Sequence, residues 1–127
     1  MSDPAQALSR VIGRGSAHTG AHHWRAQRLT ALALLLLAPW LLVSLLLLPD
    51  LGYAAMRAWA AGLFNASLLA LFIGILCWHS QLGVQVVIED YVHGVPGQVS
   101  LIASAFIHVL LAVVGVLAVA RVALGAA

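Results

Sequence analysis

The chain has 127 residues, of which 63% are apolar and only 8% are charged, and its formal net charge is +2. Soluble globular domains carry about 25% charged residues, so this composition excludes an ordinary soluble domain and indicates a single-domain membrane protein. The one cysteine, Cys77, excludes an internal disulfide and cannot by itself hold an iron-sulfur cluster. No dinucleotide-binding glycine pattern follows a strand, and we expect no nucleic-acid partner.

Three apolar segments are long enough to cross a membrane, which needs roughly 20 residues of helix. They cover residues 29–48, about 58–88, and 99 to about 124. Because lipid offers the backbone no hydrogen-bond partner, the predicted fold class is all-α, with three transmembrane helices. Pro39 is expected to kink the first helix, and Val92 to Gly97 to form a compact turn between antiparallel neighbours. Three helices bury few side chains by themselves, so we expect them to pack against a companion membrane subunit.

The basic residues are all arginines, and four of them precede the first predicted helix: Arg10, Arg14, Arg25 and Arg28. Such residues concentrate on the cytoplasmic side, so the N-terminus is predicted to be cytoplasmic and, after three crossings, the C-terminus to lie outside. Residues 1–28 are interpreted as a cytoplasmic tail and interfacial entry segment, extended or loosely ordered to about residue 20. Residues 29–127 form the predicted transmembrane domain. The tail is too polar for a secretory signal, so we expect the first helix to be retained.

His79 lies inside the second predicted helix, about nine residues before its end. An ionisable side chain inside a membrane span is costly and is by default a functional candidate. A neutral imidazole is the commonest metal ligand, and haem iron accepts it axially. Gly83 follows one turn later on the same face and leaves room for a flat macrocycle, and Asp90 lies roughly 16 Å along that face. The spacing favours His79 as a haem ligand over a histidine that is only hydrogen-bonded.

His108 is the second histidine inside a predicted span, at a depth similar to that of His79. Its chemistry also permits haem ligation, but a hydrogen bond to a neighbouring helix is the favoured interpretation. The alternative is a self-contained cytochrome b in which His79 and His108 ligate one haem. Cys77 is interpreted as a small interior residue without a redox role.

Asp90 and Tyr91 end the second predicted helix at the membrane edge. Either residue by itself is common at the membrane edge, since a tyrosine there usually anchors the helix and an acid there is usually solvated. Together, above a buried histidine, they offer a phenol donor for a carbonyl and a carboxylate for a partner arginine, as a quinone site would need. On the same side lies a cluster that suits haem propionates or, equally well, anionic lipid: His22, His23, Arg25 and Arg28.

These residues make the chain resemble the small hydrophobic membrane anchor subunit of succinate dehydrogenase, the succinate:quinone oxidoreductase of respiratory membranes. The resemblance rests on His79, Gly83 and Asp90-Tyr91-Val92 near the end of the second of three helices. Gly20-Ala-His22, followed six residues later by Arg28, resembles the family's entry segment. Ser16-Ala17 and Gln27-Arg28-Leu-Thr30-Ala are similar to the variant common in bacterial and mitochondrial-type members. The chain departs from many members because it has no Lys or Arg between Tyr91 and Gln98.

The resemblance implies that His79 is one axial ligand of a b-type haem, with the other ligand supplied by a companion cytochrome b subunit. It implies that Tyr91 hydrogen-bonds a ubiquinone carbonyl and that Asp90 orients an arginine of the quinone pocket. His22, Arg28 and Gly83 would then lie in the haem pocket, the first two near the propionates. The flavoprotein and iron-sulfur partners would oxidise succinate, so this chain is expected to be a non-catalytic anchor.

The resemblance also implies a bacterial cytoplasmic membrane, ahead of a mitochondrial inner membrane. The alternative within the same family is an anchor of a related fumarate reductase, which runs a similar architecture in the reverse direction. An interpretation from another class is a non-enzymatic accessory subunit of a transporter, whose histidines only bond neighbouring helices.

Overall fold

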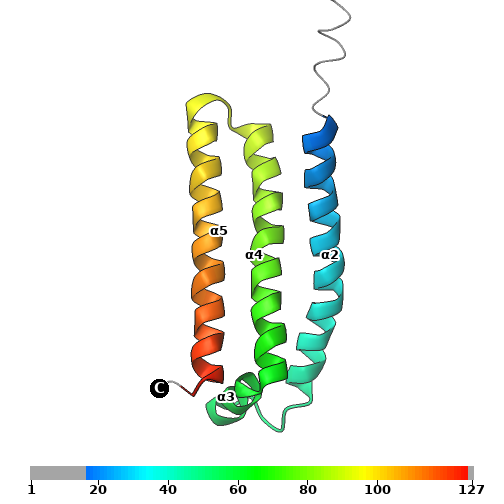
Figure 1. Cartoon of the computed structure of the whole chain (residues 1–127), viewed down its shortest axis with the longest axis vertical. Helices are drawn as coiled ribbons and strands as arrows, with labels where there is room; N and C mark the ends of the chain where they lie inside the picture. The colour runs from blue at the N-terminus through cyan, green and yellow to red at the C-terminus, as the bar shows by residue number, and fades with distance from the viewer. Residues whose placement is uncertain (1–16, 126–127) are drawn as a thin grey trace, which may run out of the picture.

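The computed structural model describes residues 17–125 of the chain, with side chains from Gly20 onward (Figure 1). Within this range the chain forms four helices: α2 (Ala17–Leu46), α3 (Tyr53–Ala61), α4 (Leu63–Tyr91) and α5 (Gly94–Ala123). Three of them contain stretches long and apolar enough to cross a membrane: Gly20–Leu46, Leu63–Tyr91 and Gly94–Ala123. The described part of the chain contains no strand. The predicted all-α fold with three spans is confirmed.

The first helix begins earlier than the sequence predicted. We expected a loose tail to about residue 20 and a helix from residue 29, but α2 is already helical from Ala17. No proline lies between Ala17 and Pro39, and Gly20 is the one residue of low helix propensity near the start, so the polar residues of the entry segment extend the helix. The helix also continues through Pro39 to Leu46. Residues 1–16, with Arg10 and Arg14, lie outside the described residues.

The second predicted span begins too early, because residues 58–61 belong to the separate helix α3. Gly62 interrupts the two helices with an extended backbone (φ −61°, ψ 127°), and its N–H donates to the carbonyl of Trp59 at 3.3 Å. The ring of Trp59 stacks on that of Trp40 from α2, with centroids 6.1 Å apart. The short helix α3 therefore closes the end of the molecule opposite the α4–α5 turn (Figure 1).

The turn between α4 and α5 is shorter than the predicted loop of Val92 to Gly97. Only Val92 and His93 lie outside the helices, and Gly94, with φ +71°, begins α5. Pro96 is tolerated in a first helical turn, where its missing N–H has no helical partner. A side chain at the buried Gly97 would collide with the carbonyl oxygen of Val92, so glycine permits this tight reversal. The predicted antiparallel pairing of the two helices is confirmed.

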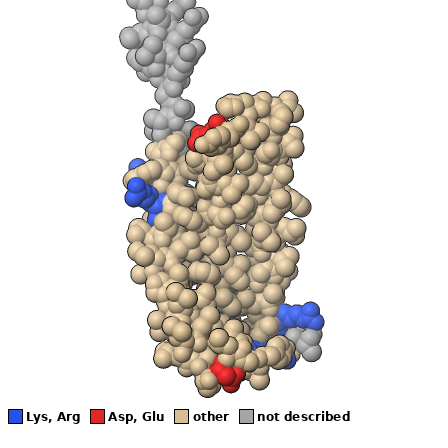
Figure 2. All heavy atoms as spheres, turned by 180° about the vertical axis from the view of Figure 1, so that it is seen from behind, with Lys and Arg blue, Asp and Glu red and all other residues tan. Residues whose placement is uncertain are grey.

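The three long helices form a single layer with α4 in the middle, in contact with both α2 and α5 (Figure 1). Among the described residues, no Cα atom of α2 lies within 8 Å of a Cα atom of α5. As expected for so thin a layer, the buried apolar side chains in this part of the chain are few: Leu37, Ala66, Leu82 and Val119. Charged side chains gather toward the two ends, and the band between them is uncharged on the face seen in Figure 2.

Candidate functional site

His79 lies on the side of α4 that packs against α2. Its Nδ1 atom is 2.9 Å from the hydroxyl oxygen of Thr30 on α2. The same hydroxyl oxygen is 2.8 Å from the carbonyl oxygen of Ala26 and 3.1 Å from that of Gln27. Thr30 is only 4% exposed, so the contact lies inside the helix pair. No residue in the described range hydrogen-bonds the other ring nitrogen of His79, Nε2.

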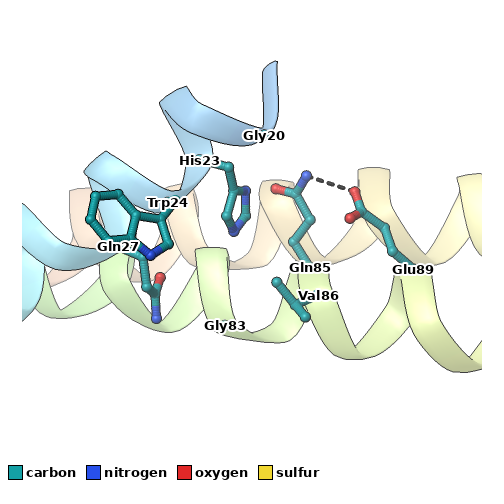
Figure 3. Close-up of a pocket in the computed structure, with 8 residues that line it drawn as sticks. All are labelled: Gly20, His23, Trp24, Gln27, Gly83, Gln85, Val86 and Glu89. Carbon is teal, nitrogen blue, oxygen red and sulfur yellow. Dashed lines mark hydrogen bonds between the residues drawn. The ribbon is translucent and has the colours of Figure 1, made fainter. Parts of the chain in front are cut away.

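Gly83 faces the same helix, one turn after His79. A Cβ atom there would meet only the Gln27 amide nitrogen at 3.9 Å, so the position is not crowded within this chain. Gly83 lines an open groove of about 660 Å³ between α2 and α4 (Figure 3). The other lining residues are Gly20, His23, Trp24 and Gln27 from α2, and Gln85, Val86 and Glu89 from α4. The predicted shared face of His79 and Gly83 is thus found, and it faces α2.

Two polar atoms in this groove are buried without a hydrogen-bond partner: His23 Nε2 and Gln27 Oε1. An unsatisfied buried polar atom is costly, so each suits a hydrogen bond from a group that enters the groove. From the sequence, His23 was expected only as part of a general cationic cluster, and Gln27 had no role of its own. A signal was present, because His23, Gln27 and Thr30 are spaced i, i+4, i+7 and therefore share one face of α2.

His22 and Arg28 are exposed on α2, and they do not share one face of it. Six residues at about 100° each add up to roughly 600°, which puts the two side chains about 120° apart around the helix. The Arg28 guanidinium lies 5.2 Å from the centroid of the Trp24 ring, a cation–π contact. The cationic cluster predicted from the sequence therefore spreads around the entry segment.

Asp90 and Tyr91 are the last two residues of α4, and both are exposed. Tyr91 is 81% exposed, and neither side chain hydrogen-bonds another described residue. The neighbouring Glu89 is engaged within the helix, since its carboxylate accepts a hydrogen bond of 2.8 Å from Gln85 (Figure 3). The phenol and the Asp90 carboxylate are thus both available to groups outside this chain.

His108 lies between α4 and α5, on the other side of α4 from the Thr30 contact. Its Nδ1 is 2.8 Å from the carbonyl oxygen of Ser104, and its Nε2 is 3.2 Å from the hydroxyl of Ser80. A carbonyl only accepts, so Nδ1 carries the proton and Nε2 accepts from Ser80. Both ring nitrogens are engaged, which matches the predicted hydrogen-bonded histidine. The structure does not bring His79 and His108 to one face of α4.

Cys77 lines a second, smaller cavity of about 300 Å³ between α4 and α5, together with His108 and small residues such as Gly74. Among the described residues, no group of three or more His, Cys, Asp or Glu side chains is arranged to hold a metal ion. Haem needs only axial ligands, so His79 with its free Nε2 is the candidate that this geometry offers.

The chain matches a family model over residues 2–119, and that model describes a succinate dehydrogenase/fumarate reductase transmembrane subunit. The hydrophobic membrane anchor subunit of succinate dehydrogenase from Paracoccus denitrificans is 32% identical over 115 residues, 90% of this chain and 88% of the relative. The subunit of the same name from Rickettsia conorii is 34% identical over 86 residues, 67% and 68% of the two chains. The succinate dehydrogenase membrane anchor subunit of Reclinomonas americana is 38% identical over 85 residues, 60% and 66% of the two chains. Because the family match covers nearly the whole chain, including the first two spans and most of the third, the chain belongs to the family of succinate dehydrogenase/fumarate reductase transmembrane subunits.

Proposed function

We propose that this membrane anchor subunit binds one side of a haem b through His79 and contributes Tyr91 and Asp90 to a ubiquinone site. The single observation that carries the proposal is the contact between Thr30 and His79 Nδ1, which leaves Nε2 without a partner among the described residues. A histidine inside a span that had only a structural role would be expected to use both nitrogens, as His108 does.

The residues around His79 fit a haem. Nε2 of His79 would hold the iron, and the absent side chain at Gly83 leaves space one turn further along α4. From different positions around α2, Arg28 would supply a positive partner for an acidic propionate, and His22 would supply a hydrogen-bond donor. Haem b, when bound, supplies a one-electron carrier inside the membrane. A second ligand to the iron would come from a companion cytochrome b subunit.

The quinone end of the proposal rests on the exposure of Tyr91 and Asp90. A phenol O–H can donate a hydrogen bond to a quinone carbonyl, and an exposed carboxylate can hold an arginine from another subunit. Both groups end α4 about three turns beyond His79, so haem and quinone would occupy successive levels of the same helix.

The relatives are named as subunits of succinate dehydrogenase, which favours succinate oxidation over fumarate reduction. The proposed partners are therefore a flavoprotein and an iron-sulfur subunit, docked at the end of the layer that carries Asp90 and Tyr91. We place that end and the N-terminus in the cytoplasm, because Arg25 and Arg28 lie at that end and two further arginines precede them in the sequence. The proposed location is the cytoplasmic membrane of a bacterium.

The test is to purify the complex in mild detergent, identify its subunits by mass spectrometry, and compare His79→Ala with His108→Ala. His79→Ala should shift or abolish the reduced b-type absorption, because the iron loses a ligand. His108→Ala should leave a low-spin haem with two nitrogen ligands. If both variants give the same high-spin spectrum, one haem within this chain is the correct model. A wild-type complex without haem or without respiratory subunits would favour the transporter accessory class.

A further inference from the structure

The Thr30 hydroxyl lies within hydrogen-bond distance of three groups, two carbonyl oxygens of its own helix and Nδ1 of His79. A hydroxyl has one proton to donate and two lone pairs that accept, whereas a carbonyl oxygen can only accept. All three contacts are attractive only if the Thr30 proton points at the carbonyls of Ala26 and Gln27. Nδ1 of His79 must then carry a proton and donate it to the hydroxyl oxygen.

We propose that Thr30 is a positioning residue for His79, which fixes the imidazole in the tautomer with the proton on Nδ1 and the lone pair on Nε2. The inference rests on the proposed function, in which Nε2 holds haem iron. Only a nitrogen without a proton can ligate a metal, so this tautomer is the one that the ligand needs. Because Thr30 belongs to α2 and His79 to α4, the contact also fixes the ring orientation through the packing of two helices.

The hydrogen bond has an electronic consequence. A ligating histidine that donates its other N–H becomes a more basic ligand, and loss of such a partner typically weakens metal binding about 10–100-fold. A more basic ligand favours the ferric over the ferrous state. Removal of the Thr30 hydroxyl should therefore raise the haem midpoint potential and lower haem retention.

The first variant, Thr30→Val, keeps the shape of the side chain but removes the hydroxyl. The second variant, Thr30→Ser, keeps the hydroxyl and removes the methyl group. The control is Ser44→Ala, because the Ser44 hydroxyl also lies on α2 but donates at 2.9 Å to the Leu41 carbonyl of its own helix. A loss of α2 stability alone would appear in the control as well, whereas a specific effect on His79 would appear only in Thr30→Val and be rescued in Thr30→Ser.

The first measurement is made on the chain without haem. Ring ¹⁵N shifts of His79, assigned by comparison with His79→Gln, are recorded on the full-length chain in lipid nanodiscs. We expect a protonated Nδ1 in the wild type and in Thr30→Ser, and a mixture of tautomers in Thr30→Val. A wild-type ring protonated on Nε2 would show that Thr30 donates to His79 and would overturn the proposal.

The second measurement uses the purified complex and records the haem midpoint potential, the low-spin electron paramagnetic resonance spectrum and haem content. The proposal expects a raised potential and a changed spectrum in Thr30→Val, with wild-type values in Thr30→Ser and Ser44→Ala. If His79→Ala loses the haem while Thr30→Val keeps the wild-type potential and spectrum, the proposed function stands and the role of Thr30 is wrong. If His79→Ala keeps the wild-type haem, the proposed function fails, and the role of Thr30 at the iron fails with it.

Discussion

Tyr91→Phe separates a quinone-binding role of the tyrosine from a structural one. The side chain is 81% exposed, and its hydroxyl bonds no described residue of this chain. Removing an exposed hydroxyl should change stability by no more than about 0.5 kcal/mol. If the phenol donates a hydrogen bond to the quinone, its loss should cost about 1–3 kcal/mol, or about fivefold to over a hundredfold in quinone reduction.

The assay compares two electron acceptors in one preparation of the purified complex. Succinate oxidation with an artificial acceptor at the soluble subunits should be unchanged, and so should haem content, while quinone reductase activity falls by the factor above. Equal losses with both acceptors would mean that the substitution damaged assembly. Full quinone activity would mean that Tyr91 is only an interfacial anchor, and the quinone part of the proposal would be wrong.

Two further predictions concern the haem end and the helix packing. Arg28→Gln should shift the haem midpoint potential in a redox titration or reduce haem content, because an acidic propionate loses a positive partner. Arg57→Gln, at the opposite end of the molecule, is the control and should change neither quantity. An unchanged potential with full haem content in Arg28→Gln would mean that Arg28 is only a topology signal. Gly115→Ala should destabilise the α4–α5 pair by about 1–3 kcal/mol, since the new Cβ would lie 2.8 Å from a methyl carbon of Ile73. Gly74→Ala is its matched control, with no atom within 4 Å, and equal denaturation midpoints for the two variants would contradict this reasoning.

The three spans could be predicted because lipid imposes a simple length and composition rule, but their ends could not. The predicted start at residue 29 followed the change in polarity, whereas the helix itself begins at Ala17, since polar residues without a breaker continue a helix. In the second span, the apolar run hid the break at Gly62, which only the backbone turn and the Trp40–Trp59 stack reveal. Hydropathy indicates which residues can lie in the hydrocarbon of the membrane. It does not give the ends of a helix, because these depend on local backbone conformation.

In the candidate site, too, part of the arrangement could be predicted from the sequence and part could not. Periodicity along one helix predicted that His79 and Gly83 share a face, because both belong to α4. It could not supply Thr30, because a contact between helices depends on how each is rotated against the other. The stripe of His23, Gln27 and Thr30 was visible on α2 as a polar face, but its partner in the fold was not. For His108, the hydrogen-bonded interpretation matches the structure, with Ser104 one turn earlier and Ser80 across the helix pair.

If His79 holds a haem, as we propose, the structure gives a reason to expect a second subunit. A low-spin b-type haem held by two histidines would need two imidazole nitrogens with free lone pairs, and His79 would supply one of them. His108, the other histidine in the middle of a span, has both nitrogens engaged and lies on the far side of α4. The layer is one helix thick and leaves most of its large apolar side chains exposed. The single-layer arrangement that limits the core of this chain therefore leaves a face of α2 and α4 open. Another membrane subunit could pack on this face and supply the second ligand.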